Sequence, residues 1–376
     1  MKFRIERAQL LKAMSRAQGV VERKNTIPIL ANVLIEARQG EQGGEISLRA
    51  TDLDIEVLEV LGAGVEQPGS TTAAAHMLHE IVRKLPDGAE LTLAAEPNAG
   101  RLEVSAGRSR FSLATLPRED FPMMASSDYA VDYAVRGADL KRLFDKARFA
   151  VSTEETRYYL NGVYLHVGEE GGERWLRAVA TDGHRLARID AALPEGAEAA
   201  PGVIVPRKTV GELIKMLEDG DGAVAVSVSE TKIRFVVGGL TLTSKVIDGA
   251  FPDYARVIPV DNPHAMEVEA KAFASSVDRV STVSQERSRT VKLSLDEDRL
   301  VLSVTAPEAG SATEELIVAY PHGALEIGFN ARYLLEIAGQ IDKENAVFLF
   351  RDAGDPTLVR EGDDRSAIYV VMPMRV

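Results

Sequence analysis

Apolar residues recur at helical spacing in several stretches of the chain. Near its start, Leu10, Leu11 and Met14 fall on one side of a helix with about 3.6 residues per turn. Pro86-Asp87-Gly88 ends a second stretch, and the alternating Asp and Gly of 219–222 end another. The pattern predicts helices over about residues 7–22, 74–85, 138–149, 206–218, 270–283 and 331–341.

Between the helices, apolar and polar residues alternate, as in 224–228, 233–237 and 240–243. This alternation is typical of antiparallel strands with one covered face. Glycines at 238–239 and acidic residues at 296–298 stand where hairpin turns are expected. The chain is therefore predicted to have an α+β fold in which helices pack on antiparallel sheets.

The arrangement occurs three times, at a period of about 125 to 130 residues. Thr51-Asp52 recurs as Thr181-Asp182, and Phe121-Pro122 as Phe251-Pro252, each 130 positions later. Copies of this length exceed solenoid repeats, so each should have its own core. Three related domains favour a scaffold over a single catalytic pocket. The predicted domains are 1–127, 128–258 and 259–376, with linkers near 126–128 and 259–263.

Composition is that of an ordinary globular protein, with 45% apolar and 27% charged residues. The chain has neither a run of 18 apolar residues nor a secretory leader pattern, so we expect a cytoplasmic protein without a membrane partner. The absence of cysteine excludes disulfides and thiolate chemistry. The histidines lack the spacing of zinc ligands, and no metal or cofactor is predicted.

The net charge of −13 argues at first against nucleic acid, because a polyanion binds a cationic surface. The helical segments differ from the whole chain in charge. They hold 20 Lys and Arg and 11 Asp and Glu, a net charge of +9, so the rest of the chain has a net charge of −22. The windows counted are 6–24, 74–85, 138–148, 206–218, 270–289 and 330–343. Either these are the cations that helix surfaces commonly carry, or the helices face a polyanion and contact its phosphates without base preference.

Two acidic motifs are candidates for chemistry. The segment Thr181–Arg185 places an acid, an imidazole and a guanidinium together, as in general acid–base catalysis, but an Asp-Gly turn between strands explains it as well. Asp52 and Asp54 resemble a metal-binding pair, yet the repeat places Asp52 at the turn equivalent to Asp182. No nucleophile stands at a recognisable spacing.

The two remaining segments have unusual composition. Gly107–Arg110 is basic but lacks the Lys-Ser/Thr ending of a phosphate loop, so it is read as a strand edge and possible interface. The terminal run Tyr369–Val376 is apolar and contains Met372 and Met374. It is either a final strand or, with its methionines, part of an adaptable peptide-binding surface.

Five motifs together resemble a known family. They are Arg157–Gly162, Thr181–Leu186, Val205–Lys208, Phe251–Tyr254 and Tyr369–Arg375. In this order they resemble the bacterial DNA polymerase III beta subunit, the DNA sliding clamp, and the resemblance spans Met1 to Val376. It implies three tandem clamp domains, each with two helices packed on antiparallel sheets, and a head-to-tail dimeric ring around duplex DNA. It implies no reaction: the ring tethers the polymerase and raises its local concentration, which confers processivity.

The resemblance also implies a groove for short apolar motifs of partner proteins. Those partners are the DNA polymerase III catalytic subunit, clamp loader subunits, translesion polymerases and mismatch-repair proteins. The matching groove positions are Leu160, Thr181, Gly183, His184, Arg185, Leu186, Pro252, Arg256, Val257, Tyr333, Val370, Val371, Met372, Pro373, Met374 and Arg375.

DNA-contacting positions carried over from the family are Lys24, Arg83, Tyr158, Tyr159 and Lys208. The two tyrosines either stack on single-stranded template or are partly buried strand residues. The dimer contact would join Arg108, Arg110, Phe111 and Leu113 of the first domain to Thr282, Val283, Glu314 and Glu315 of the third. Lys24, Val376 and the pair Thr282 and Val283 depart from the residues frequent in the family.

Two other functions remain as alternatives. A hydrolase using Asp182 and His184 predicts turnover that is lost in His184→Ala. A protein-interaction scaffold that does not bind DNA predicts no retention on circular duplex.

Overall fold

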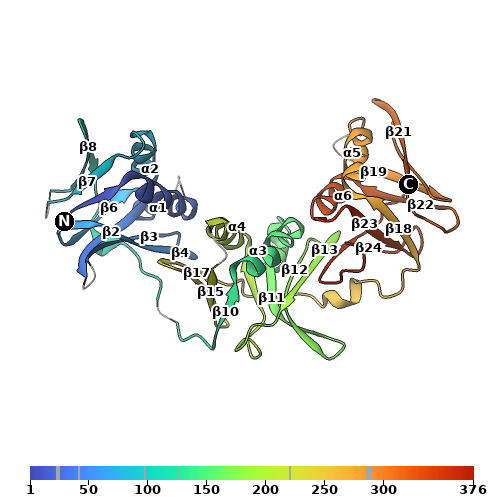
Figure 1. Ribbon diagram of the computed structural model, residues 1–376, viewed down its shortest axis with the longest axis horizontal. Helices are drawn as coiled ribbons and strands as arrows, with labels where there is room; N and C mark the ends of the chain where they lie inside the picture. The colour runs from blue at the N-terminus through green and yellow to red at the C-terminus, as the bar shows by residue number, and fades with distance from the viewer. Residues whose placement is uncertain (23–25, 41–42, 97–98, 126, 220–221, 285–289) are drawn as a thin grey trace. The chain divides into compact units, whose positions relative to one another are not determined.

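The computed structural model describes residues 1–22, 26–40, 43–96, 99–125, 127–219, 222–284 and 290–376 (Figure 1). Contacts between residues divide the chain into two compact units. The first unit comprises 1–141, 194–201 and 208–246, and the second comprises 142–193, 202–207 and 247–376. The predicted middle domain thus contributes strands to both units.

The predicted helices are confirmed, with ends that differ by a few residues. They are α1 (Arg7–Val20), α2 (Ala75–Lys84), α3 (Gly137–Asp145), α4 (Arg207–Met216), α5 (Ala270–Ser281) and α6 (Ala331–Ala338). The predictions for α3 and α4 ran too long because the chain tightens into 3₁₀ turns beyond them, at Arg148–Ala150 and Leu217–Asp219. Such turns are common at helix ends. Their apolar residues recur at nearly the same spacing as in an α-helix, so the sequence pattern continues beyond the helix.

The described residues of the first unit form two antiparallel sheets. A five-stranded sheet has the order β5-β1-β7-β8-β9, and an eight-stranded sheet has the order β10-β15-β16-β17-β4-β3-β2-β6. The strands of the first sheet are β1 (Lys2–Glu6), β5 (Gly64–Gln67), β7 (Glu90–Ala94), β8 (Arg101–Ala106) and β9 (Ser109–Ala114). Those of the second are β2 (Asn32–Gly40), β3 (Gly43–Thr51), β4 (Ile55–Gly62), β6 (Gly69–Ala74), β10 (Val131–Arg136), β15 (Ala223–Val228), β16 (Lys232–Val237) and β17 (Leu240–Lys245).

Two antiparallel sheets are also formed by the part of the second unit that the structure describes. An eight-stranded sheet has the order β14-β11-β12-β13-β25-β24-β23-β18, and a four-stranded sheet has the order β21-β20-β19-β22. The strands of the larger sheet are β11 (Gly162–Glu170), β12 (Glu173–Thr181), β13 (Arg185–Ala192), β14 (Val203–Pro206), β18 (His264–Glu269), β23 (Asn345–Phe350), β24 (Thr357–Arg360) and β25 (Ala367–Val371). Those of the smaller sheet are β19 (Thr290–Asp296), β20 (Arg299–Ala306), β21 (Gly310–Ile317) and β22 (Leu325–Asn330).

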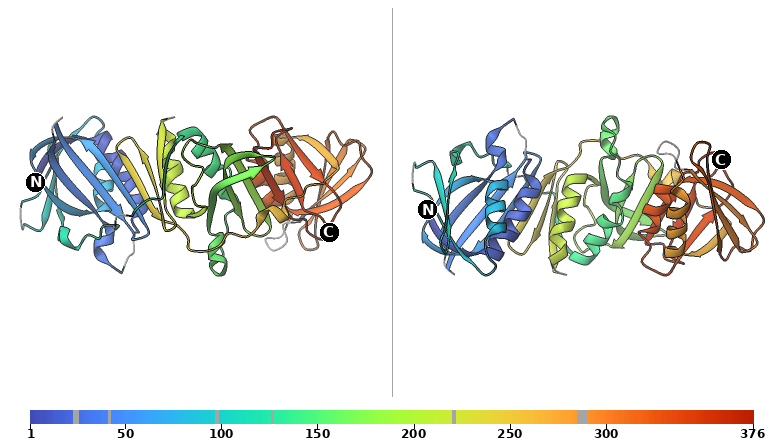
Figure 2. Two further views of the ribbon diagram at one scale, coloured as in Figure 1. Left: turned by 90° about the horizontal axis from the view of Figure 1, so that it is seen from below. Right: turned by 90° about the horizontal axis from the view of Figure 1, so that it is seen from above.

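Helices pack in pairs on these sheets because their apolar stripes need a covered face. In the first unit α1 packs against α2, β3 and β4, and Leu10 and Met14 are fully buried there. In the second unit α5 packs against α6 and the strands β18 to β21, with Phe273 buried against Phe348 at a ring distance of 4.9 Å. The view from above shows the blue pair α1 and α2 side by side, and likewise the orange and red pair α5 and α6 (Figure 2). The α+β prediction is therefore confirmed.

Hairpin turns occur where their residues predict them. Gly238, Glu297 and Asp298 all have positive φ, which the tight connections β16 to β17 and β19 to β20 require. The terminal strand, in contrast, is shorter than expected: β25 ends at Val371, and Pro373 interrupts it because proline lacks the N–H that a ladder needs. No helix of the described segments combines the length and apolar character needed to cross a membrane.

Candidate functional site

The segment Thr181–Arg185 is a tight turn between β12 and β13, and its polar side chains are used to build that turn. One carboxylate oxygen of Asp182 accepts the backbone N–H of His184 at 2.9 Å and of Arg185 at 3.0 Å. The hydroxyl of Thr181 donates to the Arg185 carbonyl at 2.7 Å and accepts from the Gly183 N–H at 3.1 Å. Gly183 has a φ of +89°, which glycine adopts at no steric cost.

The equivalent turn one repeat earlier has the same bonds. Asp52 accepts the N–H groups of Asp54 and Ile55 at 2.9 and 2.8 Å, and Thr51 donates to the Ile55 carbonyl at 2.9 Å. Among the residues described, no cluster of three or more His, Asp or Glu has a metal-binding arrangement. The geometry supports the structural interpretation of both acidic motifs, because one carboxylate oxygen of each Asp accepts backbone N–H groups of the turn and the other accepts from Arg185 or Lys208.

Arg185 extends from this turn into the interior of the second unit. Its guanidinium donates to Asp182 at 3.1 Å, to the Phe149 carbonyl at 2.7 Å and to Glu336 of α6, and lies 4.4 Å from the ring centre of Tyr333. Burial lowers the pKa of this guanidinium, and the charge of Asp182 opposes that effect. Arg185 thus joins the turn to α6 and orients Tyr333.

A cavity of about 400 Å³ opens beside Arg185. Its lining includes His184, whose ring stacks at 6.3 Å on that of Tyr333, together with Arg148, Arg207 and Arg332. The cavity is polar and carries arginines on several sides. It brings His184, Arg185 and Tyr333 together as the resemblance implies.

The opposite face of the same strand pair is apolar. Leu186 lies opposite Val370 in the register of β13 and β25, and the two form a buried cluster with Val179. Tyr164, Phe251, Tyr254 and Ile258, all partly buried, pack around this cluster. Arg185 and Val371 form the next pair in the register, so their side chains point to the other face. The strand pair therefore separates an apolar surface from the arginine-lined cavity.

The remaining predicted groove positions fall into two groups. Leu160 is 5% exposed and Val371 is fully buried, so both lie largely inside the protein. Pro252, Arg256 and Val257 are exposed on or beside the 3₁₀ turn Tyr254–Val257, and Arg256 pairs with Asp253 at 2.7 Å.

The terminal tail is held at two points. The Met372 N–H donates to the His184 carbonyl at 2.9 Å, and the Met374 N–H donates to the Gly328 carbonyl at 2.8 Å. Pro373 is half-buried, and Arg375 is exposed. Met372 and Met374 are 38% and 37% exposed, so each offers apolar surface to solvent.

The predicted DNA-contacting residues are dispersed over both units. Lys24 lies outside the described residues. Arg83, at the end of α2, donates two bonds to Glu80, at 3.0 and 2.8 Å, and this contact raises its pKa. Lys208 donates to Asp52 at 2.5 Å and to the Val20 carbonyl at 2.7 Å. Both cations are thus tied to neighbours within the chain.

Tyr158 and Tyr159 lie in a 3₁₀ segment, Glu155–Leu160, and not in a strand. Their rings meet edge to face at 5.8 Å, and Tyr158 is 55% exposed. Tyr159 is partly buried, but the interpretation as strand residues was wrong, because the segment forms 3₁₀ turns and the strand β11 begins only at Gly162.

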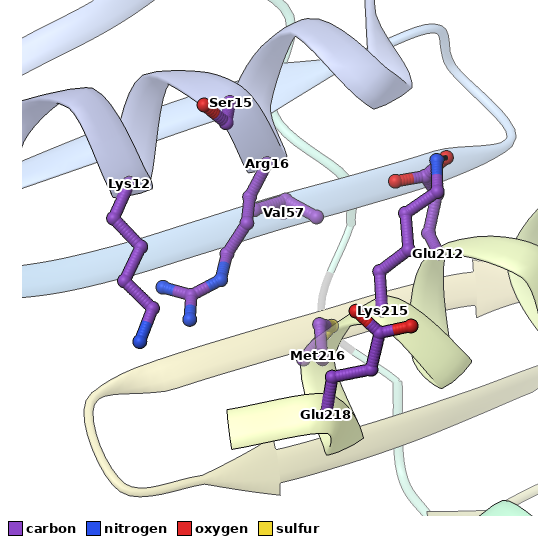
Figure 3. Close-up of a pocket in the computed structure, with 8 residues that line it drawn as sticks. All are labelled: Lys12, Ser15, Arg16, Val57, Glu212, Lys215, Met216 and Glu218. Carbon is purple, nitrogen blue, oxygen red and sulfur yellow. Dashed lines mark hydrogen bonds and ion pairs between the residues drawn. The ribbon is translucent and has the colours of Figure 1, made fainter.

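The sequence reasoning missed a cleft of about 310 Å³ in the first unit, where α1 approaches α4. Lys12 and Arg16 extend from α1 toward Met216 and Glu218 (Figure 3). Lys215 at the end of α4 donates to Glu212 at 2.8 Å. Helical spacing marks Lys12 and Arg16 as one polar face, but only the packing shows which segment lies opposite.

The candidate dimer residues lie on two sheet edges. Arg108, Arg110, Phe111 and Leu113 are on or beside β9, the edge of the five-stranded sheet, and Glu314 and Glu315 are on β21, the edge of the four-stranded sheet. Thr282 is exposed and Val283 partly exposed, just beyond α5. Glu314 binds Arg279 and Ser276 of its own chain, and Arg299 lies 3.6 Å from Glu315. Leu113 is buried, so its side chain supports the edge from within.

Comparison with known proteins covers the whole chain. Residues 1–125 match the N-terminal domain of the DNA polymerase III beta subunit, 134–253 its central domain and 255–375 its C-terminal domain. A beta sliding clamp of Caulobacter vibrioides (strain NA1000 / CB15N) is 53% identical over 376 residues, which is 100% of both chains.

Solved structures agree with this similarity. A sliding clamp from Bartonella birtlesii bound to griselimycin is 46% identical, with a TM-score of 0.96 and 100% of both chains covered. A beta sliding clamp from Caulobacter crescentus is 53% identical, with a TM-score of 0.95, covering 100% of this chain and 99% of that one.

Proposed function

The chain belongs to the DNA polymerase III beta subunit family of DNA sliding clamps, and on that premise we propose which of its residues bind DNA, partners and a second subunit. A clamp of this family encircles duplex DNA as a homodimeric ring and tethers the replicative polymerase and repair proteins. It is a processivity factor and not an enzyme. The tether raises the local concentration of polymerase at the primer end without contacts to particular bases.

The proposed partner site is the apolar surface of the second unit. Val179, Leu186 and Val370 form its floor, the segment from Phe251 to Ile258 one wall, and Met372 and Met374 a second one. The observation that supports this assignment is a set of partly buried side chains around the buried cluster, beside a tail whose methionines are exposed. The partly buried residues are Tyr164, Phe251, Tyr254 and Ile258. Met side chains are flexible and polarizable, so such a wall adapts to different apolar motifs. His184 and Tyr333 would extend the site across the turn.

We propose DNA-contacting residues in each unit: helix cations in the first, and Tyr158 and Tyr159 in the second. Lys12, Arg16 and Lys215 join Arg83 and Lys208 as cations on or beside helices of the first unit. Since several of these cations also pair with acidic residues of the chain, we expect weak attraction to phosphates. Weak, salt-dependent attraction suits a ring that must slide.

The proposed subunit contact joins β9 of one subunit to β21 of the other. Both are sheet edges, and an edge presents backbone N–H and C=O groups that a second edge can pair. Phe111 and Ile317 would supply apolar contact between them. We also propose domain boundaries at 127/128 and 258/259 and a cytoplasmic location, where bacterial duplex DNA is replicated.

Retention on DNA tests the function directly. The full-length protein is loaded by its clamp loader and ATP onto nicked circular duplex, and bound protein is measured after gel filtration. We expect the protein to stay on circles at moderate salt and to be lost when the same circles are linearised. Equal retention on circular and linear DNA would contradict a topological tether. If the protein is retained on neither circular nor linear DNA while the loader is active on another clamp, the result would favour a protein-interaction scaffold that does not bind DNA.

A further inference from the structure

The hydroxyl of Tyr254 lies between two basic side chains beneath the apolar surface of the second unit. Arg177 Nη1 is 3.3 Å from it, and His166 Nε2 is 3.0 Å from it on another side. The ring of Tyr254 packs against the cluster of Val179, Leu186 and Val370. The residue thus connects an apolar wall to a polar network behind it.

The directions of these hydrogen bonds follow from the groups involved. His166 Nδ1 is 3.0 Å from the Val167 carbonyl, which can only accept, so Nδ1 carries the hydrogen. In the neutral ring Nε2 is then an acceptor. A guanidinium only donates. The Tyr254 hydroxyl therefore accepts from Arg177 and donates to His166.

Arg177 is itself fixed by acidic neighbours on adjacent strands. It is buried and donates to the two carboxylate oxygens of Asp190 at 2.6 and 2.8 Å, and to Glu170 at 3.2 Å. Arg188 shares both acids, at 2.7 Å from Glu170 and 3.5 Å from Asp190. A bidentate pair of this kind holds its geometry, so one side of the Tyr254 hydroxyl has a rigid partner.

His166 is held by rings on both sides. Its ring stacks on Tyr164 at 4.4 Å and lies 5.7 Å from that of Tyr254, and Phe251 stacks on the far side of Tyr164 at 4.9 Å. The charged and titratable groups around it are Arg177 and Asp190 on the facing strands, Glu170 on its own strand, and Tyr164 and Tyr254. Burial, the largest effect, lowers the pKa of His166, and the charge of Arg177 acts in the same direction, while the bond to the Val167 carbonyl and the charge of Asp190 oppose it.

We propose that Tyr254 is a positioning residue of the partner site, and that Arg177 and neutral His166 together fix its wall, so that protonation of His166 weakens apolar ligands. The inference rests on the proposed partner site. A protonated His166 donates from both nitrogens, which leaves the Tyr254 hydroxyl with two donors and without its acceptor. It also places a second cation beside Arg177. Both effects move the Tyr254 ring away from the apolar floor.

Griselimycin, which is bound in the Bartonella birtlesii clamp structure, is a suitable probe, and its affinity is measured by calorimetry from pH 8 down to pH 4. The wild-type protein should bind at pH 8 and lose affinity as His166 becomes protonated in the acid part of this range. His166→Gln keeps an acceptor but does not titrate, so its affinity at acid pH, expressed relative to its own affinity at pH 8, should fall less than that of the wild type. His184 is present in both proteins, so its contribution is the same on both sides of the comparison.

Tyr254→Phe removes only the hydroxyl and should weaken binding at pH 8 by about 3- to 10-fold, the effect of one hydrogen bond. Tyr320→Phe is the matched control, because its hydroxyl donates to the Gly323 carbonyl outside this network, at 3.1 Å. The control should bind as wild type. Melting curves at each pH identify any variant that has lost its fold.

The outcomes separate this inference from the proposed partner site. Absence of binding by the folded wild-type protein at pH 8 would contradict the partner site itself. Binding with the same pH profile in wild type and His166→Gln would overturn the role of His166 alone. A second measurement does not depend on folding of variants: nitrogen-15 spectra of the wild-type protein should show the hydrogen of neutral His166 on Nδ1, and the opposite tautomer would overturn the proposed network.

Discussion

Gly328 of β22 and Met374 of the terminal tail form an isolated antiparallel bridge, in which the Met374 N–H donates to the Gly328 carbonyl at 2.8 Å. A Cβ built on Gly328 would come within 2.8 Å of the Met374 carbonyl oxygen and would collide with the Val376 side chain. The tail can lie on the sheet only because residue 328 has no side chain.

Gly328→Ala should therefore displace the tail and weaken ligands that contact Met372 or Met374. We expect the Kd of griselimycin to rise about tenfold, or ~1.4 kcal/mol, when measured by calorimetry. Gly323→Ala is the control, because a Cβ there meets nothing within 4 Å. Unchanged affinity in a folded Gly328→Ala protein would show that the tail does not contribute to binding.

Met372→Glu should abolish binding of apolar partner peptides and leave the dimer intact. The new carboxylate would have to be desolvated against an apolar ligand, and we expect a loss of more than about 30-fold. Met123→Glu is a matched control, since Met123 is an exposed methionine of the first unit, 56% exposed. Fluorescence anisotropy with a labelled peptide from the polymerase measures both, and equal losses in the two variants would refute the site.

The sequence predicts local structure well where a single pattern of residues, such as an apolar stripe or a repeated turn motif, determines it. The stripe of Leu10 and Met14 predicted α1, and the repeat of Thr51-Asp52 at Thr181-Asp182 predicted two like turns. Alternation along β25 could also have separated Val370 from Val371, which face opposite sides of the sheet. The resemblance alone had placed both in the groove.

Contacts across strands were beyond sequence reasoning. The network at the Tyr254 hydroxyl joins His166 of β11, Arg177 of β12 and Tyr254 of a 3₁₀ turn. These residues meet only because the register of β11 and β12 places His166 opposite Arg177. A shift of that register by one residue would reverse the face of every side chain. The cleft beside Lys12 and Arg16 likewise depends on how α4 approaches α1.

Glu314 should stay ionised in acid where ordinary glutamates are neutral. Its bonds to Arg279 and Ser276 lower its pKa from 4.5 to about 2. Because the folded-state pKa is depressed, the stabilisation is present above the unfolded value near 4.5 and is lost as pH falls toward 2. Carboxyl NMR titration of wild type and Arg279→Gln checks this. The variant's Glu314 pKa should return toward 4.5, and an unchanged value would exclude Arg279 as the cause.

Ile317→Lys should weaken the dimer. Ile317 ends the edge strand β21 and is 92% exposed, which is unusual for a large apolar side chain unless another surface covers it. A lysine there would bring a hydrated charge into the proposed contact with β9, and edge lysines also oppose strand pairing. We expect the dimer Kd to rise more than about tenfold by sedimentation velocity. Val260→Lys is the control, because Val260 is 99% exposed but lies in an irregular segment outside either sheet edge. A dimer equally stable in both variants would remove Ile317 from the interface.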